Sequence, residues 1–337
     1  MPHAVRREIV QPDGRRVYLY GDFVPAPEDY QAPAMPNGVY QRRWNPLRRE
    51  WVLVAASRQA RTFLPERTAC PLCPSRPGHS SEIPASRYQA AVFENRFPAM
   101  VAPGGHCEVV VYTDQHDGSF ATLPDDRLQL LADVWTDRYR ELSRRPDVRY
   151  VFIFENRGEQ VGVTLHHPHG QIYAYSFIPP VPATELRRQT RGCLQCRLIR
   201  DELDGKRRVL INGAGIVAYV PGYARWPYEV HVTSRTHRAS LAAMTPALRM
   251  SLLTSMQRVA RAYDRLFETP MPYMMVMHQA PTGAKPPTQA HLHVEFYPTL
   301  RERGKLKYLA GSESGAGVFI NDTLAEESAD RLRALLE

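Results

Sequence analysis

Residues 154–174 read Phe154-Glu-Asn-Arg-Gly-Glu-Gln-Val-Gly-Val-Thr-Leu-His-His-Pro-His-Gly-Gln-Ile-Tyr-Ala174, with His167-Pro-His-Gly-Gln171 near the end. On an extended chain, side chains two residues apart point to the same side. If this segment is a strand, His167, His169 and Gln171 therefore share one face. Two imidazoles and an amide supply a metal ligand, a nucleophile and a hydrogen-bond donor, a combination suited to handling phosphate.

The composition is that of a soluble globular protein. Its 337 residues allow one large domain or two of ordinary size, and 43 % of them are hydrophobic and 23 % charged. No apolar run reaches the roughly 18 residues of a membrane helix, and the first residues lack the apolar core of a secretory signal. We therefore expect a cytoplasmic protein.

The formal net charge of +8 raises the question of a nucleic-acid partner. The 43 basic residues are spread along the chain, however, and no block of five like charges occurs. This pattern favours a solvated basic surface with a pocket for an anionic small molecule over a nucleic-acid track.

Four of the five cysteines lie in two C-x-x-C pairs. An odd number of cysteines without a secretion signal argues against a disulfide framework, whereas two thiolates and two imidazoles make a closed tetrahedral zinc site. A zinc ribbon that joined the two pairs is the alternative, but its 123-residue spacer is far longer than usual. We predict two zinc ions, bound by Cys70, Cys73, His116 and His167 and by Cys193, Cys196, His237 and His291.

The two halves of the chain repeat the same order of motifs. From the second cysteine of each pair to the next aligned histidine there are 43 residues in the first half and 41 in the second. From that histidine to the next predicted ligand there are 51 and 54. Helices are predicted at 125–144 and 246–267, and strands at 17–20, 51–54, 91–98, 107–112, 150–154 and 172–175, then at 208–211, 215–220, 229–233, 273–278 and 291–297. This spacing predicts two copies of one α/β unit.

His169 is the candidate nucleophile. A neutral imidazole attacks phosphorus and leaves again, so it can hold a nucleotidyl group covalently between two half-reactions. Gln171 donates a hydrogen bond but is not a general acid or base near neutral pH, which favours transfer over hydrolysis. In the second half His293 holds the same position, but the nearby Glu295 would repel a phosphate, so we predict that this copy is catalytically silent.

The segments Phe154-Glu-Asn-Arg-Gly158 and His167-Pro-His-Gly-Gln171 resemble the signature of the galactose-1-phosphate uridylyltransferases, a branch of the histidine-triad superfamily. The likeness extends from about residue 43 to residue 321. It implies an α+β fold of two tandem histidine-triad-like α/β units with mainly antiparallel sheet, an internal duplication. We expect an irregular N-terminal segment at 1–40, a catalytic half at 41–185 and a second half at 186–337.

This resemblance also implies a reaction and its contacts. UMP would pass from UDP-glucose to His169 and then to galactose 1-phosphate, in an enzyme that is commonly a homodimer. The uridine would be contacted by Asn95, Arg96 and Phe97, the phosphates by Arg58, Arg61, Asn156, Thr164 and Gln171, and the acceptor by Lys307, Tyr308 and Glu313.

The metal at the second site is the point on which family members differ. Some hold iron there, with ligands that would correspond to Glu185, His278, His293 and Glu295. Those members have a histidine at the last of these positions. This departure, together with Cys193 and Cys196, favours the two-zinc pattern, which resembles that of the nucleotide-sugar phosphorylases of the superfamily.

Two other functions compete with uridylyl transfer. A phosphorylase would take a UDP- or ADP-sugar and pass the nucleotidyl group to inorganic phosphate, but such relatives usually have Ser where this chain has Gly170. A zinc-dependent nucleic-acid-binding module would explain the charge and the cysteine pairs, but not the run from His167 to Gln171. We therefore expect a uridylyltransferase.

Overall fold

The computed structural model describes residues 6–189, 192–283 and 289–336. They form two compact units. Unit 1 takes its described residues from Met1–Ile153, Thr164–Glu185 and Pro281–Pro286, and unit 2 from Phe154–Val163, Leu186–Ala280 and Pro287–Glu337. Within the described ranges, no helix is both long and apolar enough to span a membrane.

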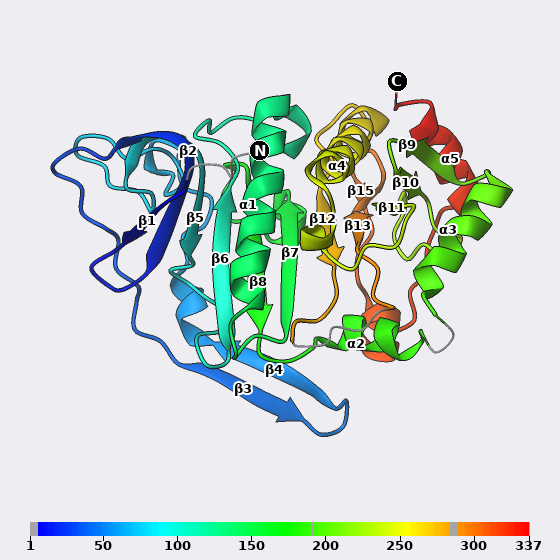
Figure 1. Ribbon diagram of the computed structural model, residues 1–337, viewed down its shortest axis with the longest axis horizontal. Coiled ribbons are helices and arrows are strands. Elements are labelled where there is room, and N and C mark those ends of the chain that lie inside the picture. Colours follow the sequence, from blue (N-terminus) through cyan, green and yellow to red (C-terminus); the bar gives the residue numbers. More distant parts are fainter. Residues whose placement is uncertain (1–5, 190–191, 284–288, 337) are drawn as a thin grey trace. The chain divides into compact units, whose positions relative to one another are not determined.

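Unit 1 is built on sheet strands in the order β1, β2, β5, β6, β8 and β7. Each neighbouring pair from β1 to β8 is antiparallel. The two units divide within β7 (Tyr150–Arg157). The other strands are Arg6–Val10 (β1), Arg16–Pro25 (β2), Ala85–Glu94 (β5), Gly105–Val111 (β6) and His169–Tyr175 (β8) (Figure 1).

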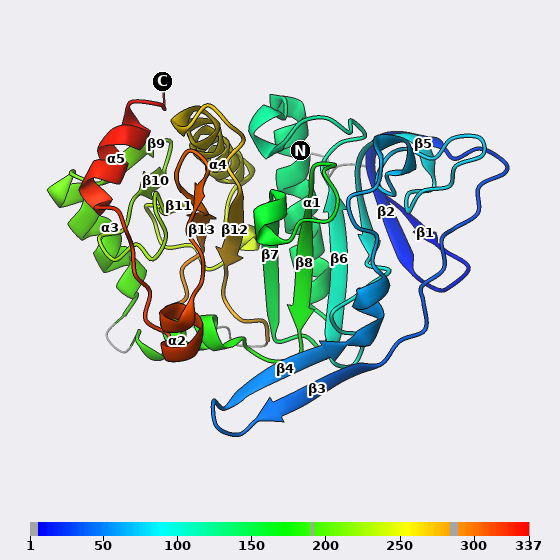
Figure 2. The ribbon, with the colours of Figure 1, turned by 180° about the vertical axis from the view of Figure 1, so that it is seen from behind.

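One long helix, α1 (Asp125–Ser143), lies across one face of these strands (Figure 1). Its apolar side chains recur three and four residues apart and are buried, as the sequence predicts. Beneath the helix, the guanidinium of Arg138 donates two hydrogen bonds of 2.6 and 2.9 Å to the carboxylate of Glu108 on β6. Both side chains are buried, and each neutralises the charge of the other, because an unpaired charge is costly in the protein interior. The opposite face of the sheet is turned toward the viewer in Figure 2.

The N-terminal residues correct one expectation. Residues 1–40 were predicted to be irregular around a short strand, but β1 and β2 form a hairpin, and β2 pairs with β5. Val17 and Leu19 of β2 pack in the same buried cluster as Phe93 of β5. The sequence shows no local signal for this arrangement, because β2 pairs with β5 some 60 residues later.

A second hairpin, β3 (Tyr40–Asn45) and β4 (Glu50–Ala55), stands apart from this sheet (Figure 1). Trp44 lies directly opposite Trp51, and their rings meet edge to face with centroids 5.0 Å apart. Both rings are partly exposed, and Leu47 in the turn is 95 % exposed. The short helix η1 (Ala56–Ala60) follows β4.

Unit 2 has sheet strands in the order β12, β13, β11, β10 and β9, all paired antiparallel. The helix α4 (Pro246–Leu266) packs against β10 and β11. Thr245 caps its N-terminus by accepting a hydrogen bond from the amide of Leu248. The strands are Val209–Gly213 (β9), Ile216–Tyr219 (β10), Val230–Ser234 (β11), Tyr273–His278 (β12) and His293–Pro298 (β13).

The remaining elements are short. The division of the chain into units falls within α2 (Pro180–Arg187), and α3 (Leu194–Gly205) and α5 (Ala325–Arg333) belong to unit 2. The others are the strands Leu300–Glu302 (β14) and Lys305–Leu306 (β15) and the single turns Arg67–Ala69 (η2), Phe120–Thr122 (η3), Glu159–Val161 (η4), Leu241–Ala243 (η5) and Ser312–Ala316 (η6).

The predicted internal duplication is confirmed by the topology. In unit 1 the chain passes through β5, β6, α1, β7 and β8, and the strands lie in the order β5-β6-β8-β7. In unit 2 it passes through β10, β11, α4, β12 and β13, and the strands lie in the order β10-β11-β13-β12. The fold class is α+β with mainly antiparallel sheet, as the sequence predicts.

Candidate active site and metal centres

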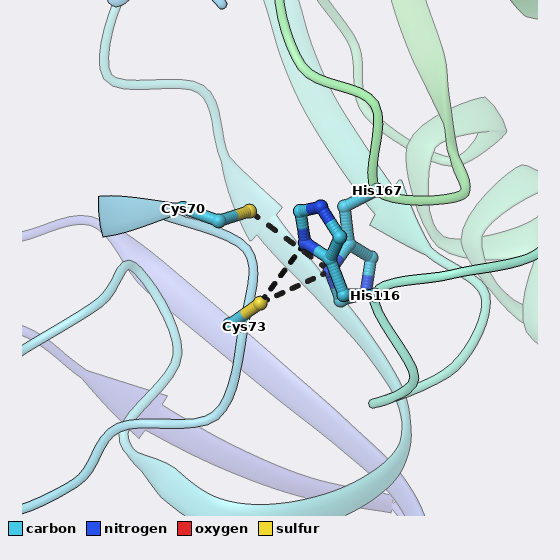
Figure 3. A group of neighbouring side chains, drawn as sticks. All are labelled: Cys70, Cys73, His116 and His167. Carbon is cyan, nitrogen blue, oxygen red and sulfur yellow. Dashed lines mark hydrogen bonds between the residues drawn. The ribbon is translucent and has the colours of Figure 1, made fainter. Parts of the chain in front are cut away.

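The first predicted set of metal ligands converges in unit 1. Figure 3 shows the side chains of Cys70, Cys73, His116 and His167 gathered around one point. The Sγ of Cys73 lies 3.2 Å from Nδ1 of His116 and 3.6 Å from Nδ1 of His167, and the Sγ of Cys70 lies 4.0 Å from the latter. Separations of this size are those of sulfur and nitrogen ligands around one zinc ion.

The surroundings of His167 prepare its ring for a metal. Its Nε2 lies 2.8 Å from the carbonyl oxygen of Thr113 and donates a hydrogen bond to it, which leaves the Nδ1 lone pair directed at the cysteines. Burial, with Cys70 alongside, raises the pKa of Cys73 to about 12. A divalent cation would supply the charge that lets both thiols ionise. This donor set therefore fits a metal ion.

The second predicted set converges in the same way in unit 2. The Nδ1 of His291 lies 3.6 Å from the Sγ of Cys193 and 3.4 Å from the Sγ of Cys196, which is 3.7 Å from Nδ1 of His237. The Nε2 of His291 donates to the carbonyl oxygen of Ser234 at 3.0 Å, so Nδ1 is again the free nitrogen. Both C-x-x-C pairs therefore join histidines of their own unit rather than each other.

The four residues predicted for the alternative second site come from both units. Glu185 belongs to unit 1, and His278, His293 and Glu295 belong to unit 2. Within unit 2, the ring of His278 stacks on that of His293 with centroids 4.9 Å apart.

His169 is the first residue of β8. Its Nδ1 lies 2.7 Å from the carbonyl oxygen of His167 and donates a hydrogen bond to it, so the Nε2 lone pair is free to attack. Burial lowers the pKa of His169, and its imidazole is consequently neutral at neutral pH. A neutral, oriented imidazole is the form that a nucleophile at phosphorus requires.

The expectation that His167, His169 and Gln171 share one strand face is wrong for His167. Residues 167 and 168 form a bend, and the ladder begins at His169. Pro168 lacks an amide hydrogen and cannot donate to a ladder, although its carbonyl oxygen accepts from Tyr112. This bend separates the buried His167, a predicted metal ligand, from the two side chains of the strand face.

The partly exposed face of β8, which carries His169 and Gln171, continues beyond Gln171. Burial alternates along the strand, with Gly170, Ile172 and Ala174 buried and the residues between them partly exposed. Tyr173 follows Gln171 on the partly exposed face, and its hydroxyl lies 3.5 Å from a guanidinium nitrogen of Arg58. Sequence reasoning missed Tyr173, although the two-residue period from His169 points to it.

Arg58 and Arg61 line an open pocket of about 610 Å³ beside η1. Arg58 also donates to the carbonyl oxygen of Phe97 at 2.9 Å, so the predicted phosphate-binding and uridine-binding residues meet in unit 1. The carbonyl oxygen of Thr164 accepts from the amide of Leu64 at 2.8 Å. This bond connects the segment before His167 to the chain that follows η1. The other pocket residues are Val54, Ala55, Ala56, Gln59 and Phe63.

The remaining predicted contacts lie in unit 2. Asn156 follows Glu155, which accepts from the hydroxyl of Tyr273, and precedes Arg157, which forms a bidentate pair with Asp264 at 2.7 and 3.1 Å. Gly158 ends the motif with a φ of 95°, where a Cβ atom would lie 2.7 Å from the side chain of Pro272. The motif therefore holds Asn156 between two anchored neighbours.

Lys307 and Glu313 pair with each other in unit 2. The ammonium of Lys307 lies 2.5 Å from the carboxylate of Glu313, which also accepts from the amides of Ala310 and Ile320. Tyr308 is 71 % exposed. The pair therefore organises the loop from which the Tyr308 ring projects.

In the second copy of the histidine motif, protein groups surround the histidine that corresponds to His169. His293 repeats the geometry of His169, because its Nδ1 donates to the carbonyl oxygen of His291 at 2.9 Å. Glu295 accepts from the hydroxyl of Tyr297 and lies 3.4 Å from the Nε2 of His231. Burial alone would raise the pKa of Glu295, but the neighbouring histidines hold it well below its usual value, so the carboxylate stays charged. A fixed negative charge here disfavours an incoming phosphate.

Both halves of the chain are similar to known proteins. Residues 100–179 match the N-terminal domain, and residues 185–337 the C-terminal domain, of the family described as galactose-1-phosphate uridyl transferase. The galactose-1-phosphate uridylyltransferase of Thermotoga maritima is 38 % identical over 315 residues, which cover 86 % of this chain and 97 % of that protein.

Two solved structures are similar over most of the chain. A uridylyltransferase structure superposes with a TM-score of 0.78 at 32 % identity and covers 88 % of this chain and 98 % of its own. An ADP-glucose phosphorylase from Arabidopsis thaliana superposes with a TM-score of 0.68 at 20 % identity, covering 88 % and 99 %, and shares the fold. The chain, by the extent and identity of these matches, belongs to the galactose-1-phosphate uridylyltransferase family.

Proposed function

We propose that this protein transfers UMP from UDP-glucose to galactose 1-phosphate through a uridylyl group carried on His169. The supporting observation is the imidazole at the start of β8, which is neutral, fixed through Nδ1 and free at Nε2. Membership of the family supports the substrates, and the arginine-lined pocket of unit 1 supports binding of a diphosphate.

The first half-reaction forms a nitrogen–phosphorus bond. The Nε2 lone pair of His169 attacks the α-phosphorus of UDP-glucose, the bond from that phosphorus to the bridging oxygen breaks, and glucose 1-phosphate leaves with the electron pair. The Nδ1 proton stays on the ring and keeps its hydrogen bond to the carbonyl oxygen of His167, which stabilises the charge that develops on the imidazole.

The second half-reaction reverses this step with another acceptor. A phosphate oxygen of galactose 1-phosphate attacks the phosphorus, the bond to Nε2 breaks, and UDP-galactose leaves. The Gln171 amide donates a hydrogen bond to a phosphoryl oxygen in both steps. Because it cannot accept a proton, it does not activate water to hydrolyse the uridylyl group. Arg58, Arg61 and Thr164 bind the phosphates, and Asn95, Arg96 and Phe97 bind the uridine.

Residues of unit 2 complete the proposal. Asn156 contacts the phosphates, and the loop of Lys307, Tyr308 and Glu313 reads the acceptor. Two zinc ions per chain, held by the two Cys-Cys-His-His groups, would supply structural cross-links. In the first group, His167 is both a ligand and the residue whose carbonyl oxygen orients His169.

The acceptor separates this proposal from a phosphorylase. Galactose 1-phosphate is expected to discharge the isolated uridylyl-enzyme at least about tenfold faster than inorganic phosphate at equal concentration, because binding of the remote sugar hydroxyls orients the attacking oxygen. Single-turnover quenched-flow measurements with each acceptor test this. Faster discharge by inorganic phosphate would instead identify a phosphorylase.

We also propose that the enzyme is a homodimer that uses the β3–β4 hairpin as an interface. Trp44 and Leu47 expose apolar surface on an extended hairpin, a feature typical of a protein contact. Light scattering at micromolar concentration is expected to give a dimer for the wild type and a monomer for the Trp44→Ser, Leu47→Ser double variant. A monomeric wild type, or a double variant that remains dimeric, contradicts the proposal.

A further inference from the structure

Glu82 is a buried carboxylate with two arginine partners and no part in the proposed reaction. It lies in the loop before β5 and is 4 % exposed. One carboxylate oxygen lies 3.0 Å from a terminal nitrogen of Arg15, and the other lies 2.8 Å from Nε of Arg96. A buried carboxylate that divides its oxygens between two guanidiniums fixes both of them.

The two arginines differ in how they are held. Arg15 is 5 % exposed, and Glu82 is only one of several acceptors around its guanidinium. The side chain of Arg96 is 21 % exposed, and its Nε, the guanidinium nitrogen nearest its backbone, lies 2.8 Å from a carboxylate oxygen of Glu82. The Nε–H is not directed at that oxygen, so Glu82 holds Arg96 as an ion pair and not through a hydrogen bond. The other acceptors of Arg15 are Asp13, Gln11 and the carbonyl oxygens of Pro33 and Glu94.

Arg96 lies in the proposed uridine-binding loop, whose other contacts are also fixed. The amide of Phe97 donates to the side chain of Asn95 at 2.8 Å, and the amide of Asn95 donates to the carbonyl oxygen of Cys107 on β6 at 2.8 Å. The guanidinium of Arg96 lies over the ring of Phe97, 5.0 Å from its centroid. Asn95 therefore anchors the backbone of this loop, and the Arg96 guanidinium contacts both the carboxylate of Glu82 and the ring of Phe97.

We infer that Glu82 is a positioning residue for nucleoside binding, acting through Arg96. This inference rests on the proposed function, which places the uridine at Asn95–Phe97. Glu82 contacts no substrate itself. By holding Arg96 near Nε, it pre-orients the guanidinium donors that recognise acceptor oxygens of the uridine. The side-chain entropy of Arg96 is then lost on folding and not on nucleotide binding.

UMP and glucose 1-phosphate are the probes for this inference, because only UMP has a nucleoside. The Glu82→Gln variant keeps the shape of the side chain but removes its charge. Its affinity for UMP, measured by calorimetry on the metal-loaded protein, is expected to fall about tenfold or more, as for loss of one contact to a charged group. Its affinity for glucose 1-phosphate is expected to stay within about twofold of wild type, since the phosphate-binding side chains are untouched.

Asp13→Asn is the matched control. It removes the other carboxylate that pairs with Arg15, at 2.7 Å, but it touches neither Arg96 nor the uridine-binding loop. It is expected to lower the unfolding temperature and to leave UMP affinity unchanged. Glu82→Asp provides a second test if Glu82→Gln folds poorly, because it keeps the charge beside Arg15 and shortens the reach to Arg96. Its UMP affinity is expected to lie between those of wild type and Glu82→Gln.

A double-mutant cycle with Arg96→Ala distinguishes a wrong role for Glu82 from a wrong uridine site. We expect Arg96→Ala to weaken UMP binding as much as Glu82→Gln does, and the double variant to be no weaker than either. Additive losses, or unchanged UMP affinity in Glu82→Gln beside a weakened Arg96→Ala, overturn the positioning role and leave the uridine site in place. Unchanged UMP affinity in Arg96→Ala overturns the uridine assignment and this inference with it.

Discussion

Replacement of His169 by glycine is expected to lower the rate of UMP transfer by about 10⁴-fold or more, the scale seen when a covalent nucleophile is removed. Both half-reactions should fail together, since each makes or breaks the bond between phosphorus and Nε2 of His169. Steady-state assays with UDP-glucose and galactose 1-phosphate measure the loss. Circular dichroism and metal content should remain those of the wild type, because the side chain of His169 is not a predicted metal ligand.

The duplicated fold offers a matched control, His293→Gly. His293 starts β13 as His169 starts β8, and it makes the same hydrogen bond to the carbonyl oxygen two residues before it. The substitution therefore repeats the same local change in the copy that we predict to be catalytically silent. We expect the folded variant to keep turnover within about threefold of wild type. Wild-type turnover in His169→Gly, or an equal loss in His293→Gly, would show that His169 is not the nucleophile.

Loss of the metal is expected to have the second largest effect, and the two sites should differ. Structural zinc contributes about 10–16 kcal/mol in small zinc domains, so replacing one cysteine ligand should lower the unfolding temperature by about 10 °C or more. Cys196→Ser should remove one metal ion and stability but preserve the turnover of the folded protein. Cys70→Ser should also reduce turnover, because His167 joins the first metal group to the carbonyl oxygen that orients His169.

Elemental analysis of protein purified without chelator, combined with calorimetric melting, tests both statements. The expected metal content is about two zinc ions per chain for wild type and about one for either variant. A wild-type content near one would remove the second site from the proposal. Equal turnover of folded Cys70→Ser and Cys196→Ser would contradict the link from the first metal group to His169.

The sequence was informative wherever the chemistry is local or repeated. The spacing of Cys70 and Cys73 to His116 and His167 predicts a cluster that the structure assembles, and the similar spacing in the second half predicts the other. The helix predicted at 125–144 is α1, and the one at 246–267 is α4. The family resemblance, carried by the run from His167 to Gln171, is confirmed by identity over most of the chain.

Other features depend on contacts between distant residues and had no local signal. The bend at Pro168 turns His167 away from the face of His169, a change that a strict two-residue period does not predict. Glu82 looks like an ordinary surface carboxylate in the sequence, since only folding brings Arg15 from β1–β2 to it. The N-terminal hairpin was missed for the same reason, because its pairing partner, β5, follows it by some 60 residues.

The proposed transfer of UMP through His169 is tested most directly by incubating the protein with UDP-glucose alone and measuring its intact mass. About one uridylyl group is expected to be added per chain. Peptide mapping is expected to place this group on His169. The group should survive in water for longer than a turnover, and galactose 1-phosphate should remove it. An unchanged intact mass with UDP-glucose, in a preparation that turns over when both substrates are present, would show that no uridylyl-enzyme forms.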